Sequence, residues 1–263
     1  MNQNIQKIIF NYASNVIIEI VAYNINQVQN QIQFGNSLGI RNFNFVNKSK
    51  TLNIDELFEN LNHFDSGNQF NFTFSLQHNY YNGNVAQITK KIQEIILKNN
   101  ALTSTQKSKA NLLVVTGSRK QRLSTINCLD WISKIEPNTI KDINVAVAYN
   151  PNINVSKLQQ ENQNLTQKLK YQFVKTVYIQ IATNQNVIEA GINFIKSLKP
   201  GVEVIICIVI PSKTFLNNFK FRPWSGVNFE NGYLDSLTEA ENQTLDIIQF
   251  CIQQKIKIVL TLN

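Results

Sequence analysis

Short runs rich in β-branched residues alternate with longer amphipathic stretches along the whole chain. A short continuous apolar run bounded by polar residues is typical of a strand buried in a parallel sheet. The pattern predicts eight such strands, at residues 15–23, 41–47, 69–77, 111–118, 143–149, 176–183, 203–211 and 255–263.

The segments between these strands have a different period. Their apolar residues recur at positions i, i+3, i+4 and i+7, which is the spacing of one face of an α-helix. Asn186, and either Ser236 or Thr238, stand where helix N-caps are expected. The spacing predicts helices at 28–38, 54–62, 85–100, 122–135, 156–173, 186–198 and 237–255.

The order of strands and helices predicts the architecture. Eight strand-then-helix units in 263 residues, with no linker or break in composition, indicate a single (β/α)8 TIM barrel over residues 15–263. Residues 1–14 are then an N-terminal extension. A doubly wound open sheet is the main alternative, but it normally carries a glycine-rich phosphate turn after the first strand, and residues 22–31 contain no glycine.

Composition narrows the class of partner. The chain is 43% apolar and 16% charged, as in a globular protein, and its formal net charge is +8. Such a charge suits nucleic acid, an anionic membrane face or an acidic protein. The basic residues are scattered, and no RNA-binding aromatic motif occurs, which argues against nucleic acid. No apolar stretch is long enough to be a transmembrane segment.

The cysteines indicate a compartment. Cys128, Cys207 and Cys251 lie far apart in apolar segments, and the chain has only two histidines. This pattern supports neither a disulfide framework nor a zinc site, so we expect reduced thiols in an intracellular protein. The N-terminal segment lacks acidic residues and carries Lys7 among apolar residues at helical spacing. With the basic net charge, it favours a mitochondrial over a cytoplasmic location.

One carboxylate stands inside the first predicted strand. Glu19 interrupts the apolar run 15–23, and burying an unpaired charge costs several kcal/mol. In a barrel, Glu19 and Gln180 of the sixth strand could both point into the mouth, where active sites of this fold lie. The alternative is that they are interior residues hydrogen-bonded to each other or to water. No metal site, Ser/His/Asp triad or Cys/His pair has candidates at sensible positions.

A basic cluster follows the fourth predicted strand. Arg119, Lys120 and Arg122 precede a predicted helix, and a helix N-terminus favours an anion. The alternative interpretation is a solvated loop.

The strand ends together form an ordered series that resembles a known family. The series consists of Glu19, then Gly117 between Thr116 and Ser118, then Ala148 and Tyr149, then Gln180, then Pro211 with Asn218 and Phe219, and finally the closing Ile-Val-Leu-Thr-Leu-Asn. In this order it resembles the methylenetetrahydrofolate reductase family, whose (β/α)8 barrel binds FAD at the carboxyl ends of its strands.

The resemblance implies a set of roles. The family passes a hydride from NAD(P)H through FAD to methylenetetrahydrofolate. Glu19 would be the general acid that protonates the folate, and Gln180 would contact the substrate. Gly117, Ser118 and Tyr149 would lie beside the flavin, and Lys168 would face its pyrophosphate.

The departures from the family gather at the flavin. The family's Arg-Gly-Asp on the fourth strand keeps only its glycine, Gly117, and of the Arg-Lys pair on the fifth helix only Lys168 remains. The whole chain has nine glycines. We therefore interpret the chain as a reductase-like barrel that has lost FAD-dependent catalysis, has no cofactor unless the ancestral FAD site is retained, and serves as an accessory or structural subunit of a larger protein assembly.

The alternative is an active NAD(P)H-dependent methylenetetrahydrofolate reductase of one-carbon metabolism. Glu19 would then be the acid and Gln180 would orient the pterin. On either interpretation, folate and NAD(P)H are candidate ligands.

Overall fold

Eight parallel strands close into a barrel in the computed structural model. Each strand pairs with its neighbours in chain order, and β1 also pairs with β8. The structure describes residues 2–21, 23–47, 67–75, 93, 110–115, 125–134 and 143–262. The strands are β1 (Val16–Ile20), β2 (Asn42–Asn47), β3 (Gln69–Ser75), β4 (Ala110–Val115), β5 (Ile143–Tyr149), β6 (Val174–Ile179), β7 (Glu203–Val209) and β8 (Lys257–Thr261). The eight predicted strands and the (β/α)8 barrel are confirmed.

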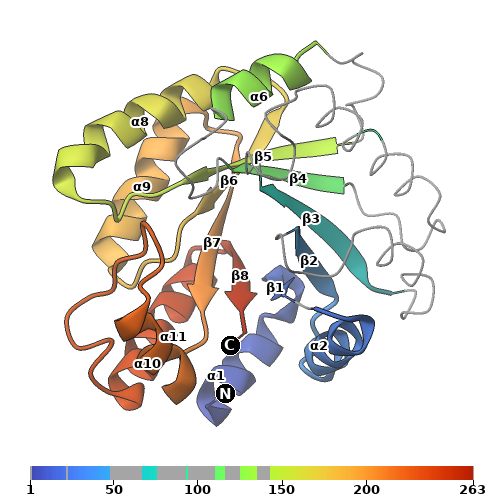
Figure 1. Ribbon diagram of the computed structural model, residues 1–263, viewed down its shortest axis with the longest axis vertical. Helices are drawn as coiled ribbons and strands as arrows, with labels where there is room; N and C mark the ends of the chain where they lie inside the picture. Colours follow the sequence, from blue (N-terminus) through green and yellow to red (C-terminus); the bar gives the residue numbers. More distant parts are fainter. Residues whose placement is uncertain are drawn as a thin grey trace.

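Helices surround the strands on the outside of the barrel (Figure 1). None of the described helices is long and apolar enough to cross a lipid bilayer. The predicted helix at 54–62 and most of the one at 85–100 lie outside the described residues. The described helices are α1 (Gln3–Asn11), the 3-10 turn η1 (Ala13–Asn15), α2 (Ile25–Ser37), α6 (Thr125–Ile132), α8 (Val155–Leu169), α9 (Gln185–Leu198), α10 (Lys213–Phe221) and α11 (Leu237–Gln253).

The helix caps correct one prediction and confirm another. Helix α9 begins at Gln185, and its N-cap is Asn184, whose side chain accepts a hydrogen bond from the backbone N–H of Val187. The prediction of Asn186 as the cap is therefore wrong, because Asn186 already lies within the first turn. Ser236 caps α11 by accepting from the N–H of Glu239.

The segment before β1 is packed against the barrel. Helix α1 buries Ile5 and Ile9 in the main hydrophobic core. The hydroxyl of Tyr12 donates a 2.9 Å hydrogen bond to the carbonyl oxygen of Ile256, just before β8. The Asn2 amide donates to Glu241 of α11 at 2.9 Å. These contacts fasten residues 2–12 to the last helix and strand of the barrel.

The barrel interior is layered because alternate residues of each strand point inward. The layer at the amino ends of the strands is polar: Lys257 pairs with Glu203 at 2.7 Å, Thr176 donates to Glu203, and Asn144 donates to Thr176. The layer above is apolar and contains Ile17, Ala146, Tyr178, Ile205 and Val259. This apolar layer separates the polar network from the mouth at the carboxyl ends.

Candidate functional site

Glu19 lies at the mouth of the barrel, one inward position above Ile17 on β1. It is only partly buried. The hydroxyl of Thr261, its register partner on β8, donates a 3.3 Å hydrogen bond to Glu19 Oε2. On the other side, Glu19 is in register with the buried Asn44 of β2. The carboxylate in the first strand is thus held at the barrel mouth by polar neighbours.

Burial and the charge of Glu19 raise the pKa of two neutral groups in the barrel interior. Burial raises the pKa of the Cys207 thiol, and the Glu19 carboxylate raises it further. Burial also raises the pKa of Tyr178, with smaller contributions from Cys207, Glu203 and Glu19. Both groups therefore stay protonated at neutral pH.

Gln180 follows β6 directly. The register of β6 with β7 places it in the same region of the barrel as Glu19. The last register pair of β6 and β7 is Ile179 with Ile206, so Gln180 stands level with Cys207. Cys207 is also the thiol whose pKa is raised by burial and further by the Glu19 carboxylate. The structure places Glu19 and Gln180 at the same end of the barrel, on β1 and after β6.

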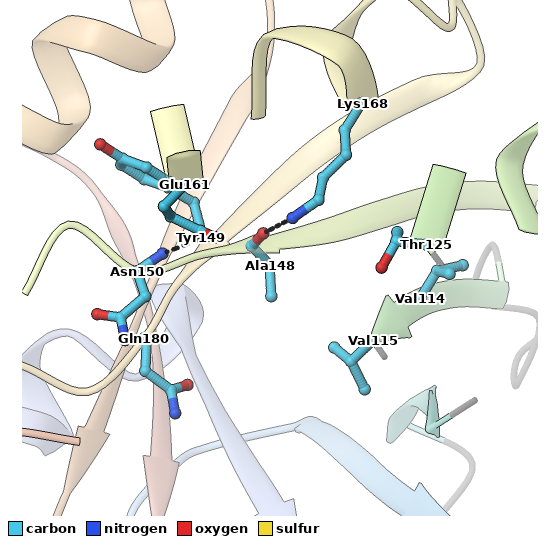
Figure 2. A pocket seen from close by; sticks show the side chains of 9 residues that line it. All are labelled: Val114, Val115, Thr125, Ala148, Tyr149, Asn150, Glu161, Lys168 and Gln180. Carbon is cyan, nitrogen blue, oxygen red and sulfur yellow. Dashed lines mark hydrogen bonds between the residues drawn. The ribbon is translucent and has the colours of Figure 1, made fainter. Parts of the chain in front are cut away.

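A cavity of about 230 Å³ opens beside Gln180. It lies at the carboxyl ends of β4, β5 and β6 and reaches outward to α6 and α8 (Figure 2). Figure 2 shows Lys168 extending from α8 toward β5, with Thr125 and Val115 across the opening. Its lining consists of Val114, Val115, Thr125, Ala148, Tyr149, Asn150, Glu161, Lys168 and Gln180.

Lys168 is a buried cation in this cavity, with 9% of its surface exposed. Its Nζ donates a 2.8 Å hydrogen bond to the carbonyl oxygen of Ala148. Burial lowers the pKa of Lys168, and the charge of Glu161 opposes part of that effect. The ammonium is therefore partly engaged by the protein's own backbone.

Tyr149 lines the cavity, but its hydroxyl is hydrogen-bonded within the protein. The hydroxyl donates to Asn162 Oδ1 of α8 at 2.7 Å, and the ring packs against Phe194 of α9. Burial, aided by the charge of Glu161, raises the pKa of Tyr149 to about 12. Glu161 itself accepts a 3.2 Å hydrogen bond from the backbone N–H of Asn150. These contacts fix the carboxyl end of β5 against α8.

The loop between α10 and α11 is fastened to the same end of the barrel. The Asn150 amide donates to the carbonyl oxygen of Gly226 at 2.6 Å, and Asn152 and Asn228 exchange side-chain to backbone hydrogen bonds. The backbone N–H of Glu230 donates to the Thr183 hydroxyl at 2.8 Å. The loop therefore borders the mouth beside β5 and β6.

Several predicted site residues lie outside the described part of the chain. These are Gly117, Ser118 and the basic cluster at 119–122. The sequence reasoning missed Glu161 and Asn162. A signal for the first existed: Glu161 and Lys168 are seven residues apart and therefore share a helix face with the buried Leu165.

Comparison with known proteins identifies the fold. No family model matches the chain, and no curated protein matches it. An uncharacterised protein from Clostridium thermocellum that binds two copies of 5-methyl-5,6,7,8-tetrahydrofolic acid superimposes with a TM-score of 0.60 at 14% identity, covering 99% of this chain and 92% of that one.

Two xylanases are also similar in structure. A psychrophilic glycoside hydrolase family 10 endo-β-1,4-xylanase has a TM-score of 0.55 at 11% identity, covering 98% of this chain and 89% of that chain. An intracellular xylanase from Thermoanaerobacterium saccharolyticum has a TM-score of 0.51 at 11% identity, covering 97% and 86%. At these identities the likeness shows a TIM-barrel fold that known proteins use both for folate binding and for glycoside hydrolysis.

Proposed function

We propose that this chain is a methylenetetrahydrofolate reductase-like barrel that binds a reduced folate at its mouth without FAD-dependent catalysis. The observation that carries the proposal is the placement of Glu19 and Gln180 at the same end of the barrel. The resemblance assigns these two residues to the folate, and the similar barrel from Clostridium thermocellum binds a methylated folate.

The chemistry of these residues suits a pterin. A pterin presents adjacent N–H donors and ring acceptors along one edge. A carboxylate such as Glu19 accepts from two N–H groups, and an amide such as Gln180 both donates and accepts. The Thr261 hydroxyl, on the neighbouring strand, donates a 3.3 Å hydrogen bond to this carboxylate. The cavity of about 230 Å³ beside Gln180 is small, as a single bicyclic ring requires.

The described residues do not fit FAD. Its pyrophosphate needs cationic groups and free backbone N–H donors. Among the described residues that line the cavity, Lys168 is the basic one, and its ammonium already donates to Ala148. The Glu161 carboxylate in the same lining would repel a phosphate.

We propose in addition that the barrel serves as an accessory subunit of a larger protein assembly. The loss of flavin-facing residues at otherwise matching strand positions supports this role. The basic net charge of +8 suits contacts with acidic partners.

A second candidate is an active reductase, favoured by the retention of Glu19 itself. Its partly buried carboxyl group at the mouth could deliver a proton to a bound folate, with Gln180 orienting the pterin. This candidate requires NAD(P)H-dependent turnover, whereas the first requires none.

One experiment separates the candidates. The purified protein is incubated with FAD, desalted and examined for flavin absorbance, then titrated calorimetrically with 5-methyltetrahydrofolate and assayed for NADH oxidation with methylenetetrahydrofolate. Folate binding with neither flavin nor turnover supports the first candidate. Retained flavin with turnover supports the second, and the absence of folate binding contradicts both.

A further inference from the structure

The outer face of α10 and the residues after it combine exposed aromatic rings with positive charge. Phe221 is 87% exposed and Trp224 is 39% exposed. Lys220 and Arg222 flank Phe221 and are themselves exposed, as is Lys213. We call these five residues the basic aromatic patch.

The fold explains why the patch faces outward. Helix α10 buries Phe215, Leu216 and Phe219 on its inner face. Lys213 and Lys220 are seven residues apart, so they lie on the same side of the helix, and the exposed Phe221 follows Lys220 at its end. Trp224 then packs edge-on against Phe215 at a centroid distance of 5.4 Å. The inner rings of α10, a helix outside the barrel (Figure 1), thus support the Trp224 ring.

The charge of this segment has a single sign. Residues 211–229 contain three basic residues and no acidic one. Within the described part of the chain, no ion pair is recorded for Lys213, Lys220 or Arg222. Phe221 therefore lies exposed between two cations that form no ion pair with any described residue. A large apolar ring contributes no burial free energy while it stays in water, so covering it would be favourable.

We propose that the basic aromatic patch docks this protein on an anionic lipid surface. Trp and Phe rings are favoured at the level of the lipid headgroups, and Lys and Arg are attracted to anionic lipids. The hydrophobic face of α10 is already used inside the protein, so the contact is made by the protruding rings and their flanking cations. This inference is independent of folate binding at the mouth.

Co-sedimentation with lipid vesicles tests the proposal. The protein is mixed with vesicles of phosphatidylcholine alone or with added phosphatidylserine, at low salt. We expect binding to the anionic vesicles only. Phe221→Ser is expected to weaken vesicle binding about tenfold, because it removes the ring that becomes buried in the lipid surface. Lys220→Glu with Arg222→Glu is expected to weaken it by at least about fivefold for each charge.

Matched variants separate a local patch from a general effect of net charge. Lys157→Glu with Lys170→Glu changes the net charge equally at exposed positions on α8 and at its C-cap. Phe10→Ser removes a ring that is 58% exposed from α1. Both should leave vesicle binding within about twofold of the original. Equal losses in the patch variants and these controls would overturn the proposal. So would failure of the folded protein to bind anionic vesicles.

Discussion

Thr261 at the end of the last strand donates a hydrogen bond to Glu19 on the first strand, at 3.3 Å. The bond lies on the β8–β1 seam, where the barrel closes, and it holds the carboxylate proposed to recognise the folate. The same contact therefore lies where the barrel closes and positions a candidate binding residue.

Replacing the donor tests that contact. Thr261→Val keeps the side-chain shape and removes the hydroxyl, so we expect a loss of about 1 kcal/mol in the free energy of unfolding, measured by urea denaturation. Thr214→Val, at an exposed position of α10, should change stability by no more than about 0.5 kcal/mol. Equal effects of the two substitutions would show that the seam contact contributes nothing particular.

Gly35 marks where α2 lies closest to the barrel. A Cβ at this position would stand 2.6 Å from the Phe43 ring and 2.8 Å from the Ile18 side chain. Gly35→Ala is therefore expected to cost about 1–3 kcal/mol through overpacking. At Gly201 an added Cβ meets nothing within 4 Å, so Gly201→Ala is the control and should be nearly neutral. A Gly35→Ala protein as stable as the control would contradict the packing described for α2.

Buried thiols make stability fall at alkaline pH. Burial raises the pKa of Cys128 and of Cys251 from 9.0 to about 12. Between these values the folded state binds more protons than the unfolded chain, so stability falls as pH rises from 9 toward 12, by up to about 1.4 kcal/mol per pH unit for each thiol. Unfolding measured from pH 8 to 11 should show a shallower decline in Cys128→Val with Cys251→Val. Identical slopes would contradict the burial assigned to the thiols.

Lys168 makes the stability of the folded protein rise with pH, in contrast to the buried thiols. Burial lowers its pKa below the ordinary 10.5, so between the lowered value and 10.5 the unfolded chain binds more protons. The stability of the unsubstituted protein relative to Lys168→Met should consequently rise with pH across that window. Urea unfolding of both proteins at a series of pH values measures the difference. A difference that stays constant with pH would mean that Lys168 is not desolvated in the folded protein.

The eight strands were predictable because parallel strands buried on both faces are continuous apolar runs, such as 143–149. Helix α10 was not predicted, since its nine residues follow β7 closely and lack a long apolar period. The pairing of Lys168 with Ala148 was also beyond the sequence. A lysine at that position is compatible with a phosphate contact or with a backbone contact, and only the packing of α8 on β5 distinguishes them.

Glu19 shows how far the candidate site could be predicted. Its place in an apolar run indicated an interior position at a strand, and the structure sets it at the mouth. Its neighbour Asn44 could not be anticipated, because cross-strand register depends on the closure of the whole barrel. The roles of Glu19 and Gln180 in folate recognition remain predictions.

The decisive test of folate recognition by Glu19 is a calorimetric titration of 5-methyltetrahydrofolate into the Glu19→Gln and Glu189→Gln proteins. Glu189 is exposed on α9, so its substitution makes the same change in charge away from the mouth. We predict that Glu19→Gln weakens binding about tenfold, or ~1.4 kcal/mol, because it removes a charge-assisted hydrogen bond, while Glu189→Gln binds as the original does. Unchanged affinity in a folded Glu19→Gln protein would contradict the account.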